Sequence, residues 1–488
     1  MLVKLQIPPG VYSNGTDYQS QGRWHDASLV RWRSGAMEPI GGWLELTPNK
    51  VTGRPSDVHQ YRSGADRKLV VGTHTALWYV APNGTLTDIT PAGYTGGRES
   101  RGNQFGYGLG TYGTSAFGIS SPDTAAVQPL TNWTLDNFGT FLVASANTDG
   151  TLYYWDGSTP TATVMAGAPV NNNASIVSEE RFVFALGAGG NDALVQWSDQ
   201  EDFTVWTPSS TNQAGDFTLQ TSGAILCGLR IRGQLLILTT VDAHTASYQG
   251  APYVYGFERV GNGCGVIGPQ AATATDSFAA WMGRDGFFMF DGYVKPLPCD
   301  VFDRVYSDIN MVQAEKVAAW NNTLAGEIWW LYPSADTAEC NRYIAWNYRE
   351  NTWAIGAIDR TCGSDEGVYD NPIMVSSDGT IYSHEIGYNY DGQIPFAESG
   401  PVELGNGDAV YMAKHLYPDE KTQGDVSATF KTRFYPNGPE STHGPYSMAA
   451  PTSVRFTGRQ VSMRIESARN TDWRFGIPRL DVTPGGTR

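Results

Sequence analysis

Short runs of alternating apolar and polar residues recur along this chain, with turn residues between them. Residues 68–90, KLVVGTHTALWYVAPNGTLTDIT, are one example. Alternation with a period of two predicts β-strands with one buried face, and Asn-Gly or Asp-Gly between strands predicts a tight hairpin. The same pattern recurs at residues 141–157, 181–199, 233–250, 278–297, 327–355 and 373–385. The chain is therefore expected to be all-β.

The spacing of these hairpin units suggests how they assemble. A period of roughly 40 to 50 residues with three or four strands per unit is typical of β-propeller blades. Each small sheet has a face that only a neighbouring sheet can cover, which favours a closed ring. We predict a β-propeller body over residues 51–400 with roughly six to eight irregular blades. A large β-sandwich with repeated hairpins is the alternative.

The two ends of the chain differ from this body. Residues 27–43, ASLVRWRSGAMEPIGGW, repeat the hairpin pattern, so we interpret residues 1–50 as the strand that closes the propeller. Residues 401–488 lose the paired hairpins and later alternate with arginine on the polar face, which predicts a small C-terminal β-sandwich-like domain. Its strands are expected near residues 426–435, 453–466 and 473–482.

One segment of the body follows neither pattern. Residues 96–123, GGRESRGNQFGYGLGTYGTSAFGISSPD, are rich in glycine and aromatic residues and have no apolar period. Long segments of this kind in a compact domain usually carry function. We interpret the segment as an insertion that projects from one face of the propeller.

Composition supports the β prediction and restricts the class of protein. The 488 residues include 56 Gly, 12% aromatic and only 17% charged residues, which is typical of short strands joined by tight turns. A coiled coil, a helical solenoid and a low-complexity tail are excluded. The first ten residues lack the apolar core of a signal peptide, and the longest apolar run, residues 76–81, is too short to span a membrane. The five cysteines are widely spaced, which favours reduced thiols.

The net charge of −16 is distributed unevenly. Residues 51–400 hold 17 basic and 36 acidic side chains, whereas residues 1–50 hold 5 and 4, and residues 401–488 hold 11 and 9. An acidic chain is normally a poor ligand for nucleic acid, because binding to the duplex requires Lys and Arg. Charge alone therefore favours a role in solubility.

The sequence contains no convincing catalytic, cofactor or metal site. Gly108 to Gly113 fit the pattern G-x-G-x-x-G, but neither a strand nor a helix flanks them, as a dinucleotide site requires. The seven histidines are scattered and have no metal-ligand spacing. Aspartates that could pair in a glycosidase precede glycine in hairpins, where aspartate stabilises the turn. These aspartates are Asp149, Asp156, Asp285, Asp291 and Asp378.

Two groups of tryptophans could stack against sugar rings, although such residues more often fill the space between blades. The first group is Trp24, Trp32 and Trp43, and the second is Trp329, Trp330, Trp346 and Trp353.

Three stretches together resemble a known family. RWHDASLVRWRSGAMEPIGGW near the start, the FGYGLGTYGTSAFG loop and the ending WRFGIPRLDVTPGGTR are similar to tail proteins of short-tailed bacteriophages. These are the tail nozzle, or packaged-DNA-stabilisation (tail hub), proteins, which prolong the portal channel. The resemblance extends along the whole chain, but no motif carries an individual residue's role.

The resemblance implies a structural virion protein without enzymatic activity, located in the tail and assembled in the host bacterial cytoplasm. It implies a homo-hexameric ring below the portal and adaptor proteins that contacts tail fibre or tail tip proteins. The ring would retain packaged double-stranded DNA and conduct it through an acidic channel, without sequence specificity or a cofactor. Residues expected to make assembly contacts are Arg459, Arg464, Arg469, Trp473, Arg474 and Arg479. Residues expected in a gating loop are Phe105, Tyr107, Tyr112 and Phe117.

Two other functions fit the same residues. The runner-up is a carbohydrate-binding or glycan-degrading β-propeller that serves as a receptor-binding tail component. A scaffold propeller for intracellular protein partners is the third. Ring formation favours the nozzle, whereas binding on a glycan array favours the runner-up.

Overall fold

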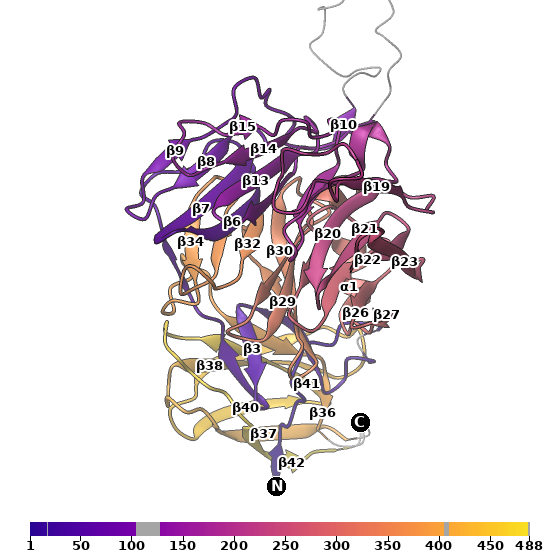
Figure 1. Cartoon of the computed structure of the whole chain (residues 1–488). Coiled ribbons are helices and arrows are strands. Elements are labelled where there is room, and N and C mark those ends of the chain that lie inside the picture. Colours follow the sequence, from indigo (N-terminus) through magenta and orange to yellow (C-terminus); the bar gives the residue numbers. More distant parts are fainter. Residues whose placement is uncertain (17, 104–126, 405–408, 487–488) are drawn as a thin grey trace, which may run out of the picture.

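The computed structural model describes residues 1–16, 18–103, 127–404 and 409–486, and its regular structure is almost entirely β-strand. Seven antiparallel sheets of four strands each form the body of the molecule (Figure 1). The first sheet contains β6 (Pro55–Ser63), β7 (Asp66–Thr73), β8 (Leu77–Val80) and β9 (Leu86–Asp88). The second contains β12 (Trp133–Phe138), β13 (Phe141–Ala146), β14 (Leu152–Trp155) and β15 (Thr163–Val164). The third contains β16 (Ala174–Val177), β17 (Val183–Leu186), β18 (Leu194–Trp197) and β19 (Gly215–Thr218). The fourth contains β20 (Ile225–Ile231), β21 (Gln234–Thr239), β22 (Asp242–Gly250) and β23 (Val254–Asn262). The fifth contains β24 (Ala272–Ala274), β25 (Ala279–Met282), β26 (Phe287–Phe290) and β27 (Val294–Leu297). The sixth contains β28 (Ala318–Asn322), β29 (Glu327–Pro333), β30 (Cys340–Asn347) and β31 (Thr352–Ala357). The seventh is β32 (Cys362–Ser364), β33 (Ile373–Val375), β34 (Ile381–His384) and β5 (Trp43–Glu45).

These seven sheets form a closed ring. The first strand of each sheet contacts the first strand of the next, and β32 of the seventh sheet contacts β6 of the first. Apolar side chains fill the space between neighbouring sheets, as Val70 and Leu142 do between the first and the second. The body is therefore a seven-bladed β-propeller. This confirms the predicted fold class and excludes a large sandwich for the body.

The ring is closed by a strand from the beginning of the chain. β5 pairs antiparallel with β34, and Trp43 lies opposite His384 in this register. The seventh sheet thus combines three strands from the end of the propeller sequence with one strand that precedes it. Of the described residues before position 51, only Trp43–Glu45 has this closing role.

The C-terminal part is a β-sandwich that also takes strands from both ends of the chain. One sheet has the order β1 (Leu2–Lys4), β42 (Arg479–Pro484), β37 (Tyr411–Tyr417), β40 (Thr452–Gly458). The other has the order β2 (Trp24–Ser28), β35 (Phe396–Ser399), β41 (Gln460–Ser467), β38 (Val426–Arg433), β39 (Ser441–Ser447), with β36 (Val402–Glu403) also paired to β41. Phe430, Phe456 and Leu480 lie in its fully buried interior. The interpretation of residues 1–50 as a closing strand is therefore wrong for β1 and β2, which are sandwich strands.

Two of the predicted C-terminal strands have different bounds in the structure. Residues 453–466 form two strands, β40 and β41, that belong to different sheets of the sandwich. The strand predicted from residue 473 begins at Arg479, directly after Pro478, which has no N–H to donate to a ladder, and Phe475 forms only isolated bridges to Met37 and Glu420.

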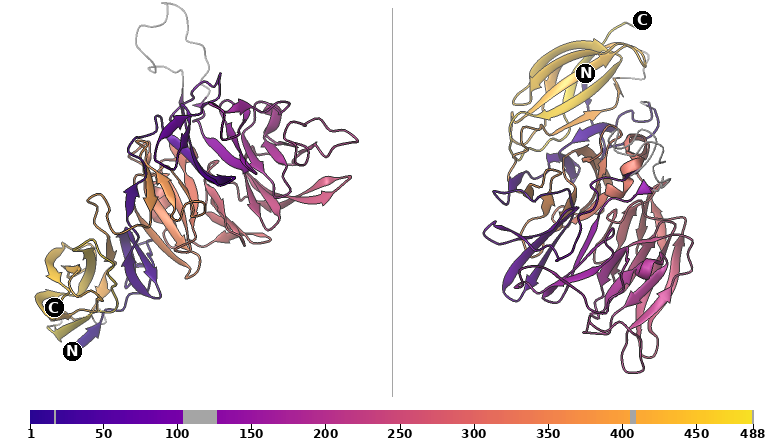
Figure 2. Two further views of the ribbon diagram at one scale, coloured as in Figure 1. Left: turned by 60° about the vertical axis from the view of Figure 1, so that its left-hand side comes forward. Right: turned by 90° about the horizontal axis from the view of Figure 1, so that it is seen from above.

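The sandwich lies at one edge of the propeller, so the molecule is elongated (Figure 2). β2 and the hairpin of β3 (Val30–Arg33) and β4 (Ala36–Pro39) join the two parts, since β2 and β3 contact the outermost strand of the sixth blade, β31. The connection between the fifth and sixth blades contains α1 (Phe302–Asp308) and the 3-10 helix η2 (Met311–Lys316). A further short 3-10 helix, η1 (Ala188–Gly190), lies in the third blade. All helices among the described residues are too short to reach across a lipid bilayer.

Candidate functional site at the base of the inserted segment

The inserted segment leaves the propeller from a two-stranded ladder that is fastened to η2. The ladder consists of β10 (Gly102–Asn103) and β11 (Val127–Gln128). The Gln313 side chain donates to the carbonyl of Arg101 at 2.8 Å and accepts from the Arg101 N–H at 3.1 Å. The Arg101 guanidinium also pairs with Glu315 at 2.9 Å. The nitrogen and the oxygen of the Gln313 amide, together with the Arg101–Glu315 ion pair, therefore hold the start of the inserted segment in place.

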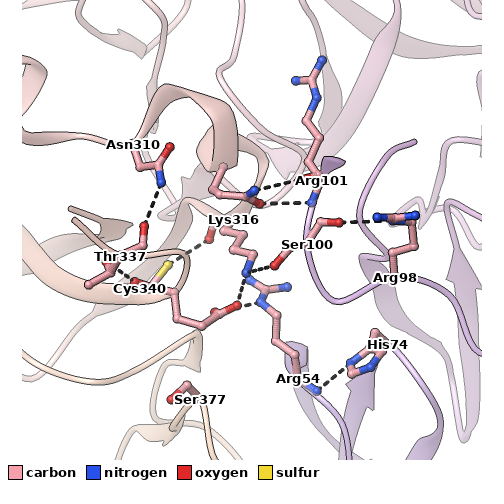
Figure 3. Close-up of polar contacts among 12 residues, drawn as sticks. Arg54, His74, Arg98, Ser100, Arg101, Asn310, Lys316, Thr337, Cys340 and Ser377 are labelled. Carbon is pink, nitrogen blue, oxygen red and sulfur yellow. Dashed lines mark hydrogen bonds and ion pairs between the residues drawn. The ribbon is translucent and has the colours of Figure 1, made fainter. Parts of the chain in front are cut away.

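A buried cluster of charges lies beside this ladder (Figure 3). Lys316 is fully buried, donates to the Ser100 hydroxyl at 2.9 Å and contacts the Glu339 carboxylate. Nε of Arg54, from the strand start of the first blade, donates to the other oxygen of Glu339 at 3.0 Å. One carboxylate thus pairs with two cations, one directly before the first blade and one from η2. The cluster joins the first blade, the sixth blade and the base of the insertion.

Burial explains the electrostatics of this cluster. Desolvation lowers the pKa of Lys316, and the charge and hydrogen bond of Glu339 oppose that effect. Nη1 of Arg54 is buried and has no hydrogen-bond partner among the described residues. Glu339 is consequently the main compensation for two buried positive charges, and its removal is expected to be costly.

His74 and Cys340 lie next to these cations but have the properties of structural residues. Nδ1 of His74 accepts the backbone N–H of Arg54 at 2.7 Å, and burial lowers the pKa of the imidazole. The Cys340 thiol donates to the Lys316 carbonyl at 3.2 Å, and burial raises its pKa to about 12. A thiol with this pKa is protonated at neutral pH and is a poor nucleophile. The arrangement therefore holds backbone segments together rather than activating a reacting group.

Metal chemistry has no candidate ligand set in the part of the chain that the structure describes. Within it, no group of three or more His, Cys, Asp or Glu side chains is arranged to hold an ion. All five cysteines are free thiols, as the spacing predicted.

The predicted assembly residues fall into different environments. Trp473 is fully buried in the interior of its own chain and donates to Ser467 at 3.1 Å. The prediction that it contacts another chain is therefore wrong, because the indole ring is fully enclosed by its own chain. Arg464 stacks on Phe396 at 3.7 Å and pairs with Glu398 at 3.2 Å, so it is engaged within the sandwich.

The remaining arginines are more accessible. Arg474 pairs with Glu38 of β4 at 3.2 Å, and Arg459 is half-buried. Arg469 and Arg479 are exposed, so both remain available for contacts with another chain. The predicted gating residues, Phe105, Tyr107, Tyr112 and Phe117, lie outside the described residues.

Two of the five hairpin aspartates have the turn-stabilising role expected of them. Asp156 accepts hydrogen bonds from the backbone N–H groups of Ser158 and Thr159, which lowers its pKa to about 2. Asp378 accepts in the same way from Thr380. The seven tryptophans considered for sugar stacking are all at most 5% exposed, so none presents its ring to solvent.

Two aspartates that sequence reasoning missed join neighbouring blades. Asp57 on β6 accepts the N–H of Leu135 on β12 at 2.9 Å. Asp136 on β12 bonds to the next blade in the same way, since it accepts the N–H of Val177 on β16 at 2.8 Å. The available signal was an aspartate in the stretch just before a hairpin unit, at a position where strand propensity disfavours it.

Comparisons with known proteins add little to this picture. No family model and no curated protein matches the chain. Among solved structures, PorZ, a bacterial surface component of the type-IX secretion system of Porphyromonas gingivalis, is 9% identical with a TM-score of 0.39, over 76% of this chain and 44% of PorZ. An exported protein from Bacteroides fragilis is 9% identical with a TM-score of 0.32, over 51% of this chain and 88% of its own. The chain thus spans less than half the length of PorZ. Similarity at this level carries no argument about function.

Proposed function

We propose that this chain is the tail nozzle, or packaged-DNA-stabilisation, protein of a short-tailed bacteriophage. It would act as a structural protein of the virion rather than as an enzyme. A homo-hexameric ring of it, assembled in the host cytoplasm, would continue the channel of the portal and adaptor proteins and contact tail fibre or tail tip proteins. It would retain packaged double-stranded DNA and conduct it during ejection. The observation that carries the proposal is the charge of the propeller body.

The propeller body is strongly acidic, and the sandwich is not. Residues 51–400 hold 17 basic against 36 acidic side chains, and residues 401–488 hold 11 against 9. Proteins bind duplex DNA by replacing the counterions of its phosphates with Lys and Arg side chains, so each accessible cation strengthens binding to the duplex. A channel wall built from this body would repel the phosphates and let the duplex slide.

Many cations of the body are also engaged within the chain. Arg230 pairs with Asp136 at 2.6 Å, and Lys295 pairs with Asp291 at 2.6 Å. Further pairs are Arg54–Glu339, Arg181–Glu201, Arg304–Asp26 and Lys316–Glu339. These cations are less available to phosphates than the sequence count suggests, which supports passage of DNA rather than binding.

The inserted segment remains the predicted gate or assembly element. Its described part, up to Asn103, is held firmly by Gln313 and Lys316. Deletion of residues 104–126 is expected to leave the propeller folded and to make packaged DNA leak from assembled particles, measured as nuclease-sensitive DNA. Normal retention in such particles would count against a gating role.

Ring formation is the direct test of the proposal. Native mass spectrometry and electron microscopy, with and without the adaptor protein, should detect a ring of about six times 53.1 kDa. Replacing the exposed Arg469 and Arg479 by Ala should reduce ring formation, whereas Arg259→Ala on the exposed face of β23 should not. A chain that stays monomeric in both conditions contradicts the nozzle.

A further inference from the structure

A polar cleft lies where the propeller meets the sandwich. Its volume is about 550 Å³, within the range of small-ligand sites. The propeller contributes α1, β29, β30 and β31 to its walls, and the sandwich contributes β2 and β35. Residues from distant parts of the sequence, Asp26 and Ile394 among them, therefore meet in one concave surface.

Two charged pairs lie in this cleft. Arg304 and Asp26 approach to 2.8 Å, whereas Arg342 and Asp308 are separated by 3.9 Å. The hydroxyl of the buried Tyr332 donates to Asp308 at 3.3 Å and holds that carboxylate in place. Because two cations face two anions, the cleft as a whole is neutral and does not favour a charged ligand.

The cleft nevertheless has unused hydrogen-bonding capacity. Within the described residues, the Arg342 guanidinium makes no hydrogen bond, and only its loose pair with Asp308 engages it. One oxygen of Asp26 and one of Asp308 also have no partner there. The side chains of Arg342, Asp308 and Asp26 are 45%, 35% and 33% exposed, so their free donors and acceptors are accessible from the cleft.

From this geometry we propose that the cleft is a binding site for a neutral carbohydrate. Each sugar hydroxyl both donates and accepts, and can therefore satisfy guanidinium donors and carboxylate acceptors in one site. Ile394, which is 56% exposed, and the partly exposed Ala357 supply apolar surface for the C–H faces of a sugar ring. A site of this size accommodates one or two sugar units. The inference is independent of the nozzle proposal and holds whether or not the chain forms a ring.

The experiment compares ligands of different charge on the intact protein. We expect neutral oligosaccharides to bind on a glycan array and in calorimetry, and sialylated or uronic-acid glycans and short peptides not to bind. Arg342→Gln and Asp308→Asn should each weaken binding of the best neutral glycan by at least about tenfold, since each removes a charged hydrogen-bond partner. Asp308→Asn retains an acceptor for Tyr332, so the fold is expected to survive.

Matched substitutions on an exposed strand and an exposed turn of other blades, Arg259→Gln and Asp276→Asn, should change the affinity less than about twofold. The proposal is overturned if the folded protein binds no neutral glycan at millimolar concentration. It is equally overturned if only acidic glycans or peptides bind, or if the control variants lose as much affinity as the cleft variants.

Discussion

His384 is a buried imidazole held between a cation and an aromatic ring. Nε of Arg360 donates to its Nε2 at 2.9 Å, and Trp43 lies 5.2 Å away between ring centroids. Because Nε2 is an acceptor, the neutral ring carries its proton on Nδ1. Protonation of His384 would place two positive charges together in a buried site. Burial, and then the charge of Arg360, therefore lower the pKa of His384 well below its usual value.

This geometry predicts a loss of stability in acid. The pKa of His384 is lower in the folded than in the unfolded chain, so its contribution is complete above about pH 6.5 and declines below it. The free energy of unfolding should fall by up to about 1.4 kcal/mol per pH unit on acidification from this group alone. His384→Gln keeps an acceptor and should flatten the profile measured by urea denaturation between pH 7.5 and 5. His415→Gln, at a half-exposed site, is the control. Identical profiles for the wild type and His384→Gln would contradict the argument.

Glu339 is a second residue whose removal should be costly. Glu339→Gln leaves Arg54 and Lys316 buried without their carboxylate, and breaking such a pair costs about 3 to 5 kcal/mol. Lys316→Met should cost less, because the Arg54–Glu339 pair remains. Thermal unfolding of the two variants checks the order. If Glu339→Gln were as stable as the wild type, the Glu339 carboxylate would give the two buried cations no net stabilisation.

At the scale of elements, the closing strand β5 joins the two ends of the propeller. Trp43 is only 2% exposed, and its indole donates to Asp391 at 2.6 Å. Its neighbour Leu44 is 52% exposed on the other face of the same strand. Besides its backbone pairing with β34, the closing strand is therefore held by one buried side chain, that of Trp43.

Trp43→Ala should open the seventh blade. Loss of a buried tryptophan costs about 3 to 5 kcal/mol, and the effect should concentrate in β33 and β34, which then have a free edge. Hydrogen exchange should increase in these strands before it increases in the third and fourth blades. Leu44→Ala is the matched control and should leave exchange unchanged. Uniform exchange across all blades in Trp43→Ala would mean that the ring unfolds as one unit.

The sequence predicted some elements much better than others. All seven hairpin units of the sequence supply the second and third strands of a blade, because local alternation and a turn specify a hairpin. The first strands carry polar residues such as Asp57, whose partner Leu135 lies in the next blade. The sandwich strands β1 and β2 pair with strands near the other end of the chain. Such long-range pairing leaves no local pattern, and the cluster of Arg54, Lys316 and Glu339 was unpredictable for the same reason.

For the whole molecule, charge makes a prediction that does not depend on ring formation. The body carries −19 over residues 51–400, and many of its cations are paired within the chain. The free protein should therefore bind duplex DNA more weakly than about 10⁻⁴ M even at low salt, where cationic proteins bind best. Fluorescence anisotropy with a labelled duplex measures this affinity. Binding at micromolar concentration would contradict a wall that lets DNA slide.

A charge-reversed variant tests whether acidity is the cause. Asp66, Glu179, Asp276 and Asp370 are all exposed. Replacing them by Lys adds two positive charges at each position, which brings residues 51–400 from −19 to −11. The variant should bind duplex DNA with a steep salt dependence, because each phosphate contact releases counterions. In virions, it should slow ejection more than assembly, since a cation in the channel retards sliding at every step. Unchanged ejection kinetics would indicate that these four positions lie away from the path of the DNA.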